Sequence, residues 1–145
     1  MKRCYLGFDE EKCVGCYACY VICQDVHNVV CEENINSRRV IRQVSAHGYD
    51  KTVCPGCIHC GRCMEICPSQ AVYREEDTGF ILVDQKKCTG CKRCESACPV
   101  GAIRFGKSGE MEKCDGCIDR IREGKKPACA AICCTGAVYF EKKPQ

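Results

Sequence analysis

The chain has 145 residues, of which 20 are cysteine, and its formal charge of +3 counts every thiol as neutral. Only two residues are leucine and none is tryptophan, so a conventional apolar core is thin for this length and metal binding is expected to be coupled to folding. The N-terminal residues lack the apolar region of an export signal, and no apolar run approaches the roughly 18 residues of a membrane span. These features predict a cytoplasmic protein without a membrane span, in which disulfides are disfavoured.

The first third of the chain contains one cysteine motif between two predicted strands. A short strand is expected around Tyr5, Leu6 and Phe8. A helix that begins near Cys19 should continue through residues 24–28, because nothing there breaks it. Residues 39–44 are β-branched and partly alternating, which predicts a strand, and residues 47–50 predict a turn.

Three of the four cysteine motifs have a regular spacing. The first and third follow C-x2-C-x2-C-x3-C, and a proline follows the third; their cysteines are Cys13, Cys16, Cys19 and Cys23, and then Cys88, Cys91, Cys94 and Cys98. This spacing is typical of [4Fe–4S] binding, in which the fourth cysteine ligates the other cluster of a pair. The fourth motif is C-x2-C-x11-C-x3-C, with Cys114, Cys117, Cys129 and Cys133.

The second motif has one cysteine too many. Its ending, Cys63-x3-Cys67 before a proline, matches the third motif and favours as ligands Cys57, Cys60, Cys63 and Cys67. The alternative register begins at Cys54. It stays open, because Cys54-Pro-Gly-Cys57 copies the C-x-G-C opening of the other motifs.

Short repeated phrases follow the motifs. Three times a small-residue turn leads to alanine, an aliphatic residue and an aromatic residue, at 71–73, 102–105 and 137–140. Turns are expected at 74–79 and 106–109, with 80–84 as the second arm of a hairpin, and the charged residues 141–145 are expected to be frayed. Each repeat of a cysteine motif and the sequence after it therefore predicts a cluster-binding loop, a short helix and a short strand. Together the repeats predict an α+β fold with small sheets.

The residue before the second cysteine is special in every motif. Gly15, Gly90 and Gly116 occupy this position, where the missing Cβ lets the backbone approach a cluster and direct N–H groups at its sulfides. His59 replaces glycine in the second motif. Two interpretations of His59 are open: it tunes one cluster through a hydrogen bond or a positive charge, or it is a surface histidine.

Other kinds of site find less support. Zinc sites pair two short knuckles, a pattern that only the fourth motif would match, so a zinc-structured interaction module remains an alternative. No nucleophile–base pair, phosphate loop or paired carboxylate stands out, so no catalytic residue is predicted. Basic residues show no aromatic interleaving, which disfavours a nucleic-acid partner. Four clusters of net charge 2− would also bring the formal charge from +3 to −5.

The chain resembles the four-cluster, ferredoxin-like electron-transfer subunits of anaerobic oxidoreductases. These include the iron–sulfur subunits of dimethyl-sulfoxide-reductase-type molybdenum and tungsten enzymes, formate dehydrogenases, and the small partners of tungsten aldehyde oxidoreductases. The resemblance covers essentially the whole chain and is most specific at KCDGCIDR (113–120) and GKKPACAAIC (124–133), with CIHC (57–60) and RRV (38–40) in support. Two departures are Cys134, where the family has proline, and a shorter second motif.

The resemblance implies two ferredoxin-like 2[4Fe–4S] modules in a nested arrangement. Residues 53–107 would form the inner module, and residues 1–52 with 108–145 the outer one. The implied ligand sets are Cys13, Cys16, Cys19 and Cys133 for cluster 1; Cys57, Cys60, Cys63 and Cys98 for cluster 2; Cys88, Cys91, Cys94 and Cys67 for cluster 3; and Cys114, Cys117, Cys129 and Cys23 for cluster 4. Cys4, Cys31, Cys54 and Cys134 have no assigned role.

The implied function is electron transfer without catalysis by the chain itself. Single electrons would pass through the four clusters between a catalytic tungsten- or molybdenum-pterin oxidoreductase subunit and a soluble ferredoxin or another redox subunit. The short chain favours an aldehyde-oxidising tungsten partner. The alternatives are a free-standing polyferredoxin carrier and, from another class, the zinc-structured module.

Overall fold

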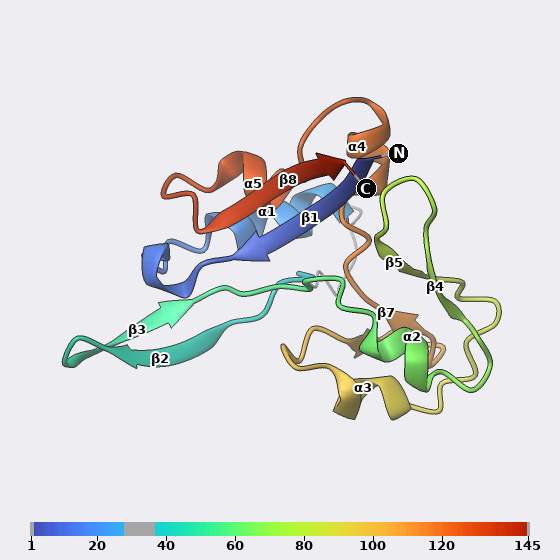
Figure 1. Cartoon of the computed structure of the whole chain (residues 1–145). Helices are drawn as coiled ribbons and strands as arrows, with labels where there is room; N and C mark the ends of the chain where they lie inside the picture. Colours follow the sequence, from blue (N-terminus) through green and yellow to red (C-terminus); the bar gives the residue numbers. More distant parts are fainter. Residues whose placement is uncertain (1, 28–36, 145) are drawn as a thin grey trace.

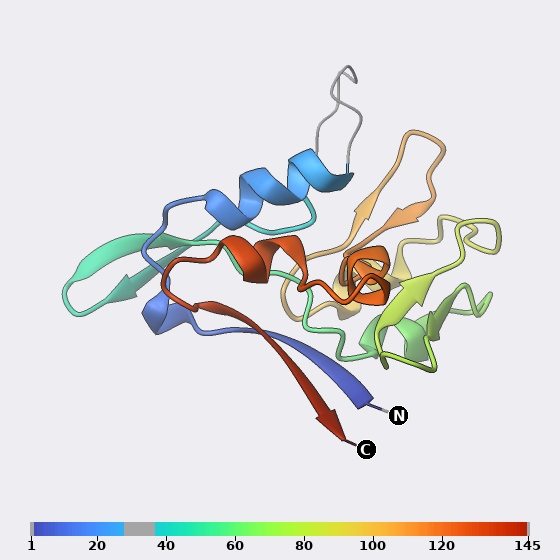
Figure 2. The same cartoon turned by 90° about the horizontal axis from the view of Figure 1, so that it is seen from above.

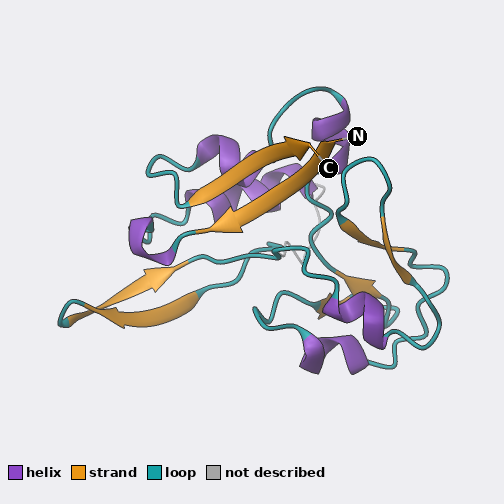
Figure 3. Ribbon diagram, in the orientation of Figure 1, coloured by secondary structure: helices purple, strands orange, loops and turns teal. Residues whose placement is uncertain are grey.

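A computed structural model of the chain describes residues 2–27 and 37–144. In these ranges short helices and two-stranded antiparallel sheets are joined by long loops (Figures 1 and 3). In chain order the elements are β1 (Lys2–Phe8), the 3-10 helix η1 (Glu10–Lys12), α1 (Ala18–His27), β2 (Arg42–Ala46), β3 (Tyr49–Val53), α2 (Arg62–Ile66), β4 (Val72–Arg74), β5 (Ile81–Val83), α3 (Arg93–Ala97), β6 (Arg104–Phe105), β7 (Met111–Glu112), α4 (Ile118–Arg122), α5 (Ala128–Ile132) and β8 (Val138–Pro144). The small ferredoxin-like α+β character expected from the sequence is therefore present.

The two ends of the chain lie together. Strand β1 pairs with β8, with Leu6 opposite Phe140 and Phe8 opposite Val138, and helix α1 packs against α5 (Figure 2). The strand and the helix expected before residue 28 are confirmed, and Asn28 lies outside the described residues. The expectation of a frayed tail was wrong for residues 141–144, which belong to β8. Pairing with β1 supplies their backbone partners, and Lys143 lies over the Tyr5 ring at 5.3 Å.

A β-hairpin extends from the body between the first and second motifs (Figure 1). The strand expected at 39–44 begins later, at Arg42, and the turn expected at 47–50 is shorter, because Tyr49 and Asp50 already belong to β3. His47 and Gly48 both have positive φ, of 53° and 82°. Two such residues form the tight turn that matches the twist of the flanking strands, which explains why a two-residue turn is sufficient.

The middle of the chain forms a second group of elements. Helices α2 and α3 pack against each other, and the hairpins β4–β5 and β6–β7 lie beside them (Figure 1). The predicted turns and the hairpin arm at 80–84 are confirmed within one or two residues.

Buried side chains gather in two small cores. One contains Cys4, Leu6, Cys19, Cys54, Phe80, Ile121, Cys129 and Val138. The other contains Cys63, Val72, Ile81, Cys94, Ile103 and Met111. Cysteine supplies a large share of both cores, so the buried cysteines take places that apolar side chains usually occupy. None of the helices in the described ranges is long and apolar enough to cross a membrane.

Candidate metal centres

The four motifs share one local geometry. In each, the third cysteine is the second residue of a helix and is buried; these residues are Cys19, Cys63, Cys94 and Cys129. The residue before the second cysteine has positive φ in every motif: Gly15 at 69°, His59 at 54°, Gly90 at 72° and Gly116 at 69°. Glycine adopts this conformation without steric cost. All four motifs therefore share this backbone conformation before the second cysteine.

Three hollows are each lined by three cysteines of one motif and the last cysteine of another. Site 1 is lined by Cys13, Cys16, Cys19 and Cys133. Site 2 is lined by Cys57, Cys60, Cys63 and Cys98. Site 3 is lined by Cys88, Cys91, Cys94 and Cys67. Segments distant in sequence therefore contribute thiols to one space, as a crossed-ligand arrangement requires.

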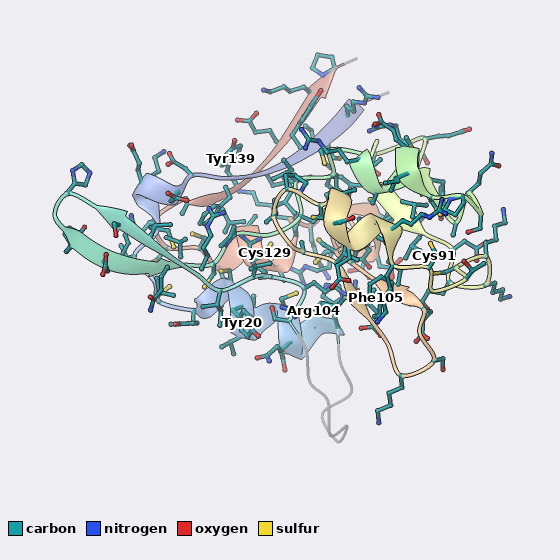
Figure 4. All side chains as sticks on the ribbon, turned by 90° about the horizontal axis from the view of Figure 1, so that it is seen from below. Tyr20, Cys91, Arg104, Phe105, Cys129 and Tyr139 are labelled. Carbon is teal, nitrogen blue, oxygen red and sulfur yellow. The ribbon has the colours of Figure 1, made fainter. Side chains whose placement is uncertain are left out.

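Cys23, Cys114, Cys117 and Cys129 are the cysteines of the first and fourth motifs that do not line site 1, and they are named site 4. Burial is the main reason that the pKa of Cys117 rises to about 11, and Cys129 and Cys23 raise it further. Burial also raises the pKa of Cys114, with Cys57 of site 2 and Cys129 contributing. Cys129 lies in the middle of the molecule, whereas Cys91 of site 3 lies toward the side away from the β2–β3 hairpin (Figure 4).

Backbone N–H groups point at several of these sulfurs. The N–H groups of Gly116, Met111 and Val138 donate to Cys114, Cys88 and Cys133 Sγ at 3.3, 3.3 and 3.4 Å. Burial acts to raise the pKa of Cys67 and Cys133, but hydrogen bonds from nearby hydroxyl and backbone groups outweigh it and lower both values. Such bonds favour the thiolate, which is the metal-binding form.

Most buried thiols, in contrast, resist ionisation. Burial raises the pKa of Cys19 to about 12 and that of Cys63 to about 11. A thiol with such a pKa is protonated at neutral pH unless a cation replaces the proton. Each of these sites offers several thiols, of which some are buried and some accept hydrogen bonds from backbone N–H groups. Such a set of donors is suitable for a cofactor that contains several metal ions and sulfide. The donor sets of sites 1–3 therefore fit a [4Fe–4S] cluster.

His59 is buried beside site 2, so the interpretation as a surface histidine was wrong. Its Nδ1 accepts a hydrogen bond from the Ile81 N–H at 3.1 Å, and its ring stacks on Phe80 with centroids 4.3 Å apart. Burial, together with the charge of Lys113, holds its pKa well below the usual value, so the ring is neutral. An accepting Nδ1 in a neutral ring places the proton on Nε2.

The Nε2–H of His59 is a buried donor with no hydrogen-bond partner among the described residues. The residue lines site 2. A buried unpaired donor is costly, and a sulfur acceptor held by Cys57, Cys60, Cys63 and Cys98 would satisfy it. This orphaned atom is a second observation that fits a cluster at site 2.

The unassigned cysteines occupy different environments. Cys54 is 1% exposed and lines site 1 with the cysteines of the first motif, although it precedes the second motif in sequence. This placement supports the register of the second motif that begins at Cys57. Cys4 is part of a core, Cys134 is exposed, and Cys31 lies outside the described residues.

Three residues near the sites were not singled out individually from the sequence. His27 Nε2 lies 3.3 Å from Cys117 Sγ, and nothing in its sequence context indicated this contact. With Asp115 it forms a group of three possible metal ligands that uses the same Cys117 thiol as site 4. Arg39 and Lys113 are buried cations; the only sequence signals were the RRV and KCDGC phrases in which they stand.

Comparison with known proteins finds similarity to iron–sulfur domains and iron–sulfur subunits of redox enzymes. The family model described as "4Fe-4S dicluster domain" matches residues 45–143, and one described as "4Fe-4S binding domain" matches residues 10–26. The B subunit of the anaerobic dimethyl sulfoxide reductase of Escherichia coli is 35% identical over 91% of this chain and 70% of that protein. The formate dehydrogenase iron–sulfur subunit of Wolinella succinogenes is 35% identical over 90% of this chain and 76% of that protein. The thiosulfate reductase electron transfer subunit PhsB of Salmonella typhi is 35% identical over 91% of this chain and 72% of that protein.

Proposed function

Because this protein belongs to the family of iron–sulfur electron-transfer subunits with 4Fe–4S dicluster domains, we propose that it relays single electrons through four [4Fe–4S] clusters. The observation that carries this proposal is the set of three hollows, each lined by three cysteines of one motif and the last cysteine of another, with Cys54 in addition at site 1. The named relatives are electron-transfer and iron–sulfur subunits of redox enzymes. The protein is likewise an electron-transfer subunit of a complex and not the catalytic subunit.

The cysteines of sites 1–4 would hold clusters 1–4, with the ligand sets implied by the resemblance. Bound there, each cluster would supply one-electron redox chemistry. The protein's part is to exclude water, direct N–H groups at sulfur, and adjust the local charge. In sites 1–3 the second cysteine is exposed, at Cys16, Cys60 and Cys91, whereas Cys117 of site 4 is buried.

The order of sites that we propose along the molecule is 1–4–2–3. Cys129 of site 4 lies near enough to Cys19 of site 1 to raise its pKa. Cys57 of site 2 in the same way raises the pKa of Cys114 of site 4, and Cys94 of site 3 raises the pKa of Cys63 of site 2. Electrons would thus enter and leave at sites 1 and 3, with site 4 as an enclosed intermediate step.

We also propose the nested modules, with residues 53–107 inside residues 1–52 and 108–145. The pairing of β1 with β8 and the packing of α1 on α5 support an outer module made from both chain ends. The packing of α2 on α3 supports an inner module.

The proposed partners are a catalytic tungsten- or molybdenum-pterin oxidoreductase subunit and, at the other end, a soluble ferredoxin or another redox subunit. The names of the relatives place them in dimethyl sulfoxide reductase, formate dehydrogenase and thiosulfate reductase. Within this class, a tungsten-dependent aldehyde-oxidising partner is the specific candidate expected from the sequence.

Metal analysis of the native protein, purified anaerobically, tests the function. We expect about sixteen iron and sixteen acid-labile sulfide per molecule, because each cluster contains four of each. Tungsten or molybdenum should co-purify in a larger subunit. Zinc in place of iron would overturn the proposal in favour of a zinc-structured interaction module. A lone, fully loaded protein in the native lysate would instead identify a free polyferredoxin carrier.

Replacement of His59 tests its tuning role. His59→Asn places an oxygen near the position of Nδ1, so it keeps an acceptor for the Ile81 N–H while it removes the Nε2–H donor. Asparagine also tolerates the positive φ of this residue. Loss of a hydrogen bond to sulfur should lower the midpoint potential of one cluster and leave three unchanged. Redox titration followed by EPR measures this.

The control for His59→Asn is the iron content, which should stay at the native value. Four unchanged midpoint potentials in a fully loaded variant would contradict the tuning role. Shifts of similar size in all four clusters would also contradict it, because they would indicate a general change in the fold.

A further inference from the structure

Two buried cations lie at the junctions between cysteine sites. We propose that Arg39 and Lys113 are internal counter-charges that raise the reduction potentials of the clusters on either side of them: Arg39 at sites 1 and 4, and Lys113 at sites 4 and 2. This inference rests on the proposed function, because it requires clusters at these sites. It goes further by assigning a shared electrostatic role to two residues that are not ligands.

Arg39 is 4% exposed and belongs to the segment that separates the first two motifs. Its Nε and Nη2 donate to the carbonyl oxygen of Cys54 at 2.9 and 2.6 Å, and Cys54 lines site 1. The guanidinium also lies 5.7 Å from the ring centroid of Phe8, another residue that lines site 1.

Lys113 is 5% exposed and precedes the first cysteine of the fourth motif. Its Nζ donates to the carbonyl oxygens of Ile81 and Cys114, at 2.7 Å for Cys114. Both Lys113 and Ile81 line site 2, whereas Cys114 belongs to site 4. The ammonium group is therefore held between sites 4 and 2 by one carbonyl group from each side.

Neither cation has a carboxylate partner among the described residues. The ion pairs in residues 2–27 and 37–144 involve other groups. A buried charge without a counter-charge is strongly unfavourable, and carbonyl hydrogen bonds compensate only in part. A cluster of four thiolates around a 2+ core has a net charge of 2−, so clusters on both sides would supply the missing counter-charges.

The core around Cys54 connects Arg39 with two sites. Cys54, whose carbonyl oxygen accepts the hydrogen bonds from Arg39, belongs to the same buried core as Cys19 of site 1 and Cys129 of site 4. Arg39 is therefore held beside both sites, as Lys113 is beside sites 4 and 2.

A nearby cation favours the reduced cluster, because reduction adds one negative charge. The attraction is strong in an interior of low dielectric constant. Loss of either cation should therefore lower the potentials of its two flanking clusters. Site 4 is flanked by both cations, so its potential should respond to both substitutions, and site 3 should respond to neither.

The test is a redox titration of Arg39→Gln, Lys113→Gln and the double variant, in the whole protein with its clusters. Glutamine removes the charge and retains an amide donor for the carbonyl groups. Each single variant should lower two of the four midpoint potentials by at least about 59 mV. This shift corresponds to a tenfold change in the equilibrium constant of a one-electron reduction. One midpoint should shift in both variants, and the double variant should shift three.

Lys92→Gln is the matched control. Lys92 lines site 3 but is exposed, so solvent screens its charge and a smaller shift is expected. An equally large shift in Lys92→Gln would contradict the role of burial. Unchanged potentials in fully loaded glutamine variants would overturn the proposal, as would shifts with no midpoint in common.

Charge-conserving variants separate a role of charge from one of hydrogen-bond geometry. Arg39→Lys and Lys113→Arg should assemble four clusters and keep potentials near the native values. If the glutamine variants lose clusters and these variants lose them as well, geometry and not charge is required, and the proposal fails. Iron and sulfide analysis of the unaltered protein comes first, so that failure of the four-cluster function is recognised separately.

Discussion

Removal of iron and sulfide from the native protein is expected to unfold it completely at 25 °C. The two cores are small and consist in large part of cysteine, so apolar packing alone gives limited stability. Arg39 and Lys113 would each lose their anionic neighbours, at a cost of about 3–5 kcal/mol for a buried charge left unpaired. Two such losses are comparable to the ~5–15 kcal/mol by which typical proteins are stable.

Far-UV circular dichroism and limited proteolysis measure this unfolding. The clusters are destroyed with an oxidant and a chelator, and the thiols are then fully reduced so that disulfides do not contribute. Protein exposed to the chelator alone, with its clusters retained, is the control and should keep its native spectrum. Addition of iron and sulfide should restore the fold. A reduced, metal-free chain with native circular dichroism and native protease resistance would contradict the coupling of metal binding to folding.

Replacement of Cys98 by alanine is expected to disrupt the cluster of the second motif and not that of its own motif. Cys98 follows α3 in the third motif, but it lines site 2 with Cys57, Cys60 and Cys63. A single substitution should leave three intact [4Fe–4S] clusters, because one cluster loses a ligand. Mössbauer spectroscopy counts the intact clusters.

Double variants distinguish crossed ligation from ligation within one motif. Cys98→Ala with Cys57→Ala should still leave three intact clusters, since both residues serve site 2. Cys98→Ala with Cys88→Ala should leave two, since Cys88 lines site 3. The reverse result would contradict crossed ligation. Cys134→Ala is the matched control, because Cys134 is exposed and unassigned, and it should leave all four clusters intact.

Local features of the fold were predictable from the sequence. The helix after Cys19 and the hairpin that contains residues 80–84 were expected where they occur, because their signals depend on neighbouring residues. The strand formed by residues 141–144 was missed. Its charged sequence resembles a solvated tail, and only the distant strand β1 gives it backbone partners. Strand β3 was missed because the turn was expected to be longer.

In the candidate site, too, some features were predictable from neighbouring residues and others depend on distant segments. Spacing identified the candidate ligands and the unusual position of His59, and it left open whether that ring is exposed. Burial of His59 depends on Phe80 and Ile81, which come from another segment. The sequence does not distinguish Arg39 and Lys113 from the other basic residues as buried cations. Their burial follows from the packing of remote loops around them.

The spacing of the cysteines was enough to predict the type of metal centre, because a run of ligands three and four residues apart is a local property of a loop and a helix. The tertiary structure brings cysteines of different motifs to the same hollow, because Cys67, Cys98 and Cys133 each follow a helix and line a hollow with three cysteines of another motif. It also decided which charges are shielded from water. Burial depends on what covers a residue, and the covering segments are far away in sequence.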